Sequence, residues 1–87
     1  MRLSDYVATR QMSAGSSPVG CRGRVTSAGA IRPGRTGEVM VAIRGGVEAF
    51  LARDVDGGAI EPYAEVVVVE YEPPRLVFVS RIYPEEF

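Results

Sequence analysis

The chain has 87 residues and a formal net charge of −1, with 46% hydrophobic and 24% charged residues. This length and composition predict one small globular domain and exclude both a large two-domain enzyme and a wholly disordered chain. The chain has no histidine, no lysine and one cysteine, Cys21, which excludes Ser-His-Asp and Cys-His catalysis, a Ser-Lys dyad, an intrachain disulfide and a Cys/His zinc site.

The charge is unevenly distributed along the chain. Residues 1–60 contain eight arginines against five acidic residues, a balance of +3, and residues 61–87 contain two arginines against six glutamates, a balance of −4. A basic face would explain this asymmetry, although scattered solvated charge is the simpler interpretation. No run approaches the ~18–20 apolar residues that cross a bilayer, and we expect the chain as given to be soluble.

Residues 1–18 differ from the rest and predict a flexible tail or linker. Leu3, Tyr6 and Val7 have near-helical spacing and Ser4 is a candidate cap, so a single helical turn and plain disorder are both open. Residues 13–18, Ser-Ala-Gly-Ser-Ser-Pro, have the composition of a linker.

From Val19 onward the pattern predicts five β-strands, over residues 19–26, 38–44, 47–53, 65–71 and 75–83. The Gly45-Gly46 pair predicts a type I′ hairpin turn, because both glycines accept positive φ angles. Asp56-Gly57-Gly58 predicts a second turn, and the Val66–Val69 run predicts a strand buried on both faces.

Five strands without a long helix predict an all-β fold, a small closed or partly open OB-fold-like barrel over residues 19–84, with an SH3-like barrel as the other option. Residues 85–87 are expected to form a short C-terminal tail. The expected core is Val25, Val39, Val41, Ile43, Phe50, Val66, Val68, Val77 and Val79.

The glycine, proline and valine pattern resembles the C-terminal soluble domain of the NfeD-like family. The matching positions run from Gly20 and Gly23, through Pro33-Gly34 and Gly37-Glu38-Val39, to Ile60, Val66, Val68, Val77, Val79 and Pro84. The chain departs from the family where it has Tyr63 in place of a usual glycine, and where Pro73-Pro74 replaces a glycine turn.

The resemblance implies an OB-fold domain that lies next to a membrane and usually follows transmembrane helices. It implies partners of the stomatin/flotillin-like (SPFH) class or a membrane protease, and a function in membrane protease regulation or membrane organisation. We therefore expect a membrane-associated full-length protein with this soluble domain, or otherwise a cytoplasmic one.

The residues give no coherent catalytic set. Asp54 and Asp56 fit turn chemistry better than acid–base catalysis or a Ca²⁺ loop, and Cys21 fits a small core residue better than a reactive thiol. The glutamates at 61, 65, 70 and 72 are expected at the solvated ends of a buried strand. We expect a non-enzymatic domain with no cofactor and no metal.

The expected interaction surface is Arg32, Arg35, Arg44, Arg53 and Tyr63, because loops on a rigid scaffold carry recognition. An anionic lipid surface and a second copy of the chain are further candidate partners. The alternative function is a stand-alone OB-fold module that binds single-stranded nucleic acid, with Tyr63, Tyr71 and Tyr83 as stacking groups. Those tyrosines lie in the acidic part of the chain, which disfavours this alternative.

Overall fold

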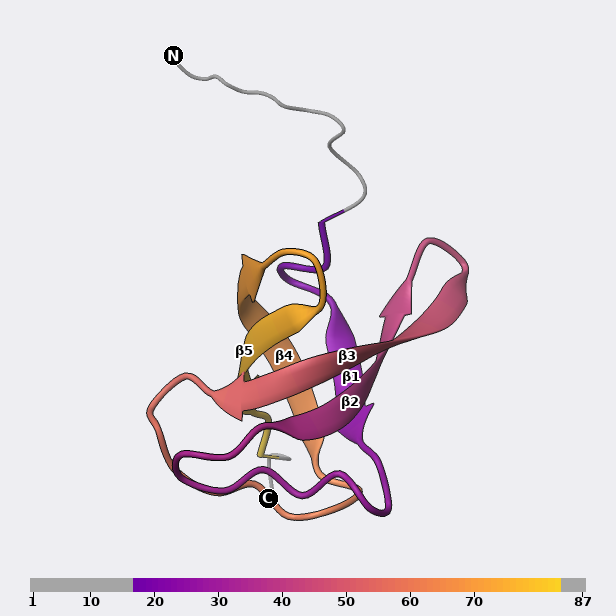
Figure 1. Ribbon diagram of the computed structural model, residues 1–87. Helices are drawn as coiled ribbons and strands as arrows, with labels where there is room; N and C mark the ends of the chain where they lie inside the picture. Colours follow the sequence, from indigo (N-terminus) through magenta and orange to yellow (C-terminus); the bar gives the residue numbers. More distant parts are fainter. Residues whose placement is uncertain (1–16, 84–87) are drawn as a thin grey trace.

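The computed structural model describes residues 17–83, which form five strands and the loops between them (Figure 1). The strands are β1 (Arg22–Val25), β2 (Gly37–Ile43), β3 (Gly46–Asp54), β4 (Glu65–Glu72) and β5 (Leu76–Arg81). The helical turn expected within residues 1–12 and the tail expected at 85–87 lie outside the described residues, as does most of the linker expected at 13–18.

The strands close into a barrel in the order β1-β2-β3-β5-β4. β1 pairs with both β2 and β4, and every neighbouring pair is antiparallel except β3 and β5, which run parallel. The strand count and the closed barrel confirm the predicted OB-fold-like class, because the OB-fold is a five-stranded barrel of this kind.

The core consists of the inward-facing residues of all five strands. Eight of the nine predicted core residues are buried; Ile43 is half-buried and packs against the cluster. Closure of a small barrel leaves room only for side chains inside, which explains why the interior is built mainly from valines. The structure adds four core residues that were not predicted, namely Ile31, Ala52, Ile60 and Ala64.

The first strand is shorter than predicted. Gly20 has a φ angle of 88°, and the Cys21 N–H donates to the Pro18 carbonyl at 3.0 Å, so residues 18–21 form a turn. Positive φ at a glycine is typical of such a turn and does not occur in a regular strand. β1 therefore begins at Arg22, three residues after Val19, where the predicted strand begins.

The β2–β3 hairpin turn lies one residue earlier than predicted. Ile43 pairs with Gly46, and the central residues are Arg44 and Gly45, with φ angles of 57° and 79°. Positive φ angles at both central residues are typical of the predicted type I′ turn. The central residues differ from the prediction, however, because Arg44 takes the first position and Gly46 already belongs to β3. The inward positions of Val39 and Val41 fix the register, and the turn follows from it.

β4 is buried on one face only, contrary to the prediction. Val66 and Val68 are buried, whereas Val69 is exposed. The pairing with β5 shifts between Val68 and Glu70, which marks Val69 as the extra residue of a β-bulge. Because of this bulge, Glu70 faces outward and Tyr71 faces the core. Without the extra residue, Glu70 would point into the core and Tyr71 would point to solvent.

Candidate interaction surface

Two long loops close the barrel at the end opposite to the one where residue 17 enters (Figure 1). The loops cover residues 26–36 and 55–64, and they are joined by a bridge between Ile31 and Ile60. Each of these isoleucines donates its N–H to the other's carbonyl at 2.9 Å, and both side chains are buried. The barrel end is thus held by backbone hydrogen bonds and apolar packing together.

Gly29 and Gly37 allow the first loop to lie directly against β2. A Cβ atom on Gly37 would come within 2.0 Å of the Gly29 carbonyl oxygen, and one on Gly29 would meet Thr26 Oγ1 at 2.4 Å. Both glycines are therefore required by the close approach of two backbones, not by an unusual φ angle. This approach fixes where the tip of the loop projects.

The tip of the loop is a tight turn over the sequence Arg32-Pro33-Gly34-Arg35. Pro33 followed by Gly34 with a φ angle of 74° is the pattern of a type II turn. The Arg35 N–H donates to the Arg32 carbonyl at 2.9 Å and the Arg32 N–H donates to the Arg35 carbonyl at 3.3 Å. The two exposed arginines are therefore directly opposite each other across the turn.

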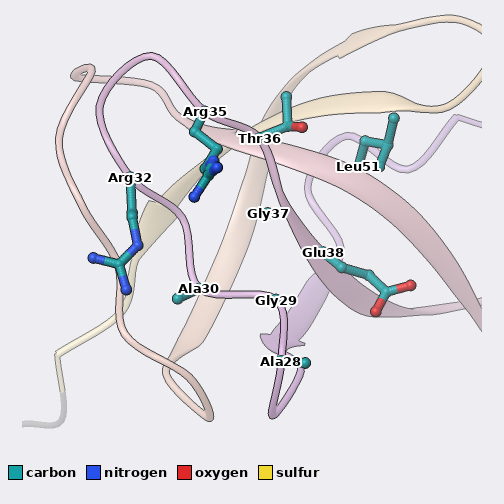
Figure 2. A pocket seen from close by; sticks show the side chains of 9 residues that line it. All are labelled: Ala28, Gly29, Ala30, Arg32, Arg35, Thr36, Gly37, Glu38 and Leu51. Carbon is teal, nitrogen blue, oxygen red and sulfur yellow. The ribbon is translucent and has the colours of Figure 1, made fainter.

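A cleft of about 670 Å³ lies between this loop and the outer face of β2 and β3 (Figure 2). Arg32 and Arg35 line it on the loop side, and Glu38 and Leu51, which pair across β2 and β3, line it on the strand side. The Glu38 carboxylate accepts a hydrogen bond from the Thr26 hydroxyl at 3.0 Å. The cleft thus combines two arginines and one glutamate with an exposed leucine.

Arg53 lies close to the same loop. A depression of about 200 Å³ is lined by Arg32, Gly34, Arg53 and Phe78, among others. Phe78 pairs with Arg53 across β5 and β3 and faces outward, half-buried. Val77 and Val79 take the inward positions on either side of it.

The structure does not bring all five predicted surface residues together. It brings together Arg32, Arg35 and Arg53, but Arg44 lies at the tip of the β2–β3 hairpin. Tyr63 lies in the second loop beside β1. The Tyr63 N–H donates to the Val25 carbonyl, and the Arg24 side chain donates to the Tyr63 carbonyl at 3.0 Å. Whether this surface binds a partner stays a prediction.

Tyr63 has an unusual backbone conformation. Its φ angle is 70°, in the left-handed region that favours glycine, and its side chain is 64% exposed. The family pattern of a glycine at this position therefore has a plain physical reason. Tyr63 retains that backbone conformation at a steric cost.

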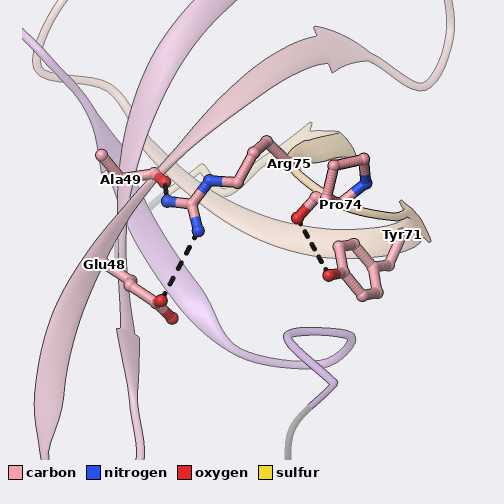
Figure 3. A network of polar contacts seen from close by, with 5 residues as sticks. All are labelled: Glu48, Ala49, Tyr71, Pro74 and Arg75. Atoms are coloured by element: carbon pink, nitrogen blue, oxygen red, sulfur yellow. Dashed lines mark hydrogen bonds and ion pairs between the residues drawn. The ribbon is translucent and has the colours of Figure 1, made fainter.

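The opposite end of the barrel carries a second polar network (Figure 3). Arg75 donates to the Ala49 carbonyl and forms an ion pair with Glu48 at 3.6 Å. Tyr71 packs edge-on against Phe50 and donates its hydroxyl to the Pro74 carbonyl at 3.1 Å. Tyr71 is therefore a structural residue, and its predicted role as a stacking group for bases is not supported.

The side chains that were weighed as catalytic or metal-binding groups, those of Asp54, Asp56 and Cys21, belong to a turn and to the core packing. Asp54 caps the β3–β4 turn, because its carboxylate accepts hydrogen bonds from the N–H groups of Asp56 and Gly58 at 3.2 and 3.1 Å. Cys21 packs against the core. Within residues 17–83, no three His, Cys, Asp or Glu residues are grouped so that they could hold a metal ion.

The barrel and its two closing loops define a small OB-fold domain. The model of the NfeD C-terminal domain family matches residues 22–80, so the chain belongs to this family, as the resemblance predicted. No curated protein matches the chain. No helix in the part of the chain that the structure describes could span a membrane.

Two solved structures are similar to the chain. One is the soluble domain of the NfeD protein YuaF from Bacillus subtilis, with 26% identity and a TM-score of 0.63, covering 76% of this chain and 75% of that one. The other is the C-terminal domain of stomatin operon partner protein 1510-C from Pyrococcus horikoshii. It has 26% identity and a TM-score of 0.61, covering 88% of this chain and all of that one.

Proposed function

We propose that the chain is a non-enzymatic protein-interaction domain that acts with an SPFH (stomatin/flotillin-like) membrane protein. The observation that carries the proposal is the likeness to a domain described as a stomatin operon partner, within one family. The finer function in this proposal is regulation of a membrane protease or organisation of the membrane, in a full-length protein that is membrane-associated.

The composition and the shape of the domain support this proposal. The chain has neither histidine nor lysine, the residues that most often activate a nucleophile. The two loops at the end of the barrel opposite to residue 17 offer an exposed, rigidly held surface. Loops held in this way on a rigid scaffold are the usual place for recognition.

Binding of single-stranded nucleic acid is the second candidate function. The observation in its favour is that Arg32 and Arg53 border one depression together with Phe78, which combines cations with an aromatic ring. Against it, this depression is small, the acidic Asp54 also lines it, and Phe78 is half-buried.

Co-purification tests the proposed function. The full chain, carrying an affinity tag, is expressed with the stomatin-like protein of the same organism, solubilised in a mild detergent and treated with nuclease. We expect the stomatin-like protein to elute with the chain at near-stoichiometric amount. Loss of the complex after nuclease treatment, with steeply salt-dependent binding to oligo-dT, would favour the nucleic-acid function instead.

A further inference from the structure

The outer face of β2 and β3 is unusually apolar for a surface that faces solvent. An antiparallel sheet normally presents polar side chains on its outer face. Here Met40 and Ala49 face outward as a pair, and Leu51, opposite Glu38, is 50% exposed. The apolar side chains continue along the strands and form one strip.

Two depressions make this strip a continuous groove. The cleft lined by Arg32, Arg35, Glu38 and Leu51 adjoins a second depression of about 240 Å³, which is also lined by Glu38 and Leu51 and reaches Arg75 at its far end. The groove therefore runs from the Arg32–Arg35 turn to the β4–β5 turn. OB-fold barrels bind their ligands on this face, between these two loops.

The charge around the groove favours an anionic partner. Three arginines line the two depressions against one acidic residue, Glu38. In residues 17–83, no carboxylate lies within ion-pair distance of Arg32 or Arg35, whereas Arg75 is already paired with Glu48. The available positive charge is thus concentrated at the loop end, next to Leu51.

Arg32 and Arg35 carry like charges at facing positions of the turn. They form a hydrogen-bonded pair directly across the turn, and like charges placed directly opposite in this way are destabilising. A carboxylate held between the two guanidinium groups would convert this repulsion into two charge-assisted hydrogen bonds. The positions of the two arginines therefore favour an anionic ligand at the tip of the loop.

We propose that this groove binds an extended peptide segment of the partner that carries carboxylates beside an apolar side chain. The carboxylates pair with Arg32 and Arg35, and the apolar side chain covers Leu51 and Ala49. This inference rests on the proposed function, since it names the surface through which the partner is bound. A nucleic acid fits the groove less well, because among residues 17–83 the one aromatic residue that lines it, Phe50, is buried and cannot stack a base.

The test compares three probes on the ¹⁵N-labelled full chain. The peptide acetyl-EELLEE-amide is titrated and followed by amide chemical shifts, with acetyl-QQLLQQ-amide and a short oligo-dT in parallel. We expect the acidic peptide to shift the amide signals of residues 29–38 and of Leu51. Its affinity should fall about tenfold or more when both glutamate pairs are replaced by glutamine, or when Arg32→Glu is introduced into the chain. Arg44→Glu, which makes the same charge change at the far hairpin, is the matched control and should bind like the original chain.

The outcomes separate this inference from the proposed function. If the stomatin-like protein co-purifies equally well with the original chain and with the Arg32→Glu and Arg35→Glu variants, the groove proposal is overturned and the proposed function stands. If the acidic peptide binds at the groove but the stomatin-like protein does not co-purify, the groove proposal stands and its partner is another protein. Oligo-dT that binds in place of the acidic peptide also overturns it.

Discussion

The guanidinium carbon of Arg75 lies 4.8 Å from the centre of the Phe50 ring, so that one residue of the β4–β5 turn covers the aromatic side chain that closes the core. Tyr71 contacts the same ring edge-on, with the two ring centres 6.1 Å apart. Arg75 also donates to the Ala49 carbonyl, which belongs to the part of β3 that precedes its pairing with β5. Arg75 therefore both covers the core and occupies an exposed strand edge.

Replacement of Arg75 by alanine should lower the free energy of unfolding by about 1–2 kcal/mol, through loss of the cation–π contact and the hydrogen bond to Ala49. The ion pair with Glu48 is exposed and contributes little. Arg75→Lys keeps the charge but not the planar group and should be intermediate. Urea denaturation measures both variants, and an alanine variant as stable as the original chain would contradict this role.

The bulge at Val69 predicts a large contrast between two adjacent valines. Val68→Thr places a hydroxyl in the core without a partner and should cost about 1–3 kcal/mol, whereas Val69→Thr should change stability by less than about 0.5 kcal/mol. Thermal unfolding of the two variants is the measurement. Equal losses would mean that Val69 is buried and that the strand has two covered faces.

Gly37 and Gly46 lie near opposite ends of the β2–β3 hairpin and test the close approach of the first loop. Gly37→Ala should destabilise the domain by several kcal/mol, on the order of the larger core mutations, because its Cβ meets a backbone oxygen that cannot move freely. Gly46→Ala should be nearly neutral, since the closest atom to its Cβ is 4.0 Å away. A tolerated Gly37→Ala would show that the loop is not packed against β2.

Substitutions at Tyr63 should reveal the cost of its positive φ angle. Tyr63→Gly should be more stable than Tyr63→Ala by about 1 kcal/mol, because both remove the ring but only glycine accepts this backbone conformation without strain. Denaturant unfolding of the pair isolates the backbone effect from the side-chain effect. If the alanine variant is the more stable, the backbone at residue 63 is not left-handed in solution.

Replacement of Arg32 by glutamate should have opposite effects on the stability of the domain and on its binding of an acidic peptide. Arg32→Glu places unlike charges across the turn and should raise the free energy of unfolding by about 0.2–1 kcal/mol while it weakens binding of the acidic peptide. The measurement is thermal unfolding at low salt, repeated at high salt, where the gain should shrink. A variant that loses stability would indicate that the two guanidinium groups do not repel each other.

Much of the fold follows from local patterns that the sequence displays. The alternation in residues 38–44 predicts which face of β2 is buried, and turn residues separate the five strands. The bulge could not be predicted, because four successive valines have no alternation that a phase shift would interrupt. Ile31 and Ile60 also escaped prediction, since each lies in a glycine- and proline-rich loop and becomes buried only when the two loops meet.

The candidate surface was predicted only in part. Arg32 and Arg35 flank a Pro-Gly turn, and that local signal indicates their proximity. The approach of Arg53 and Phe78 to the same turn depends on the parallel pairing of β3 with β5, which joins segments far apart in the chain. The groove on β2 and β3 likewise exists only because the loop folds back onto the sheet, which requires the contact between Gly29 and Gly37.

The most direct test of the central claim is quantitative co-purification of the full chain with the stomatin-like protein of the same organism, with and without Arg32→Glu. The account predicts a complex that survives nuclease treatment with the original chain and with the Arg44→Glu control. It predicts a loss of about tenfold or more in the bound partner with Arg32→Glu. Absence of the stomatin-like protein from the original chain's eluate, while the chain remains folded, would contradict the proposed function.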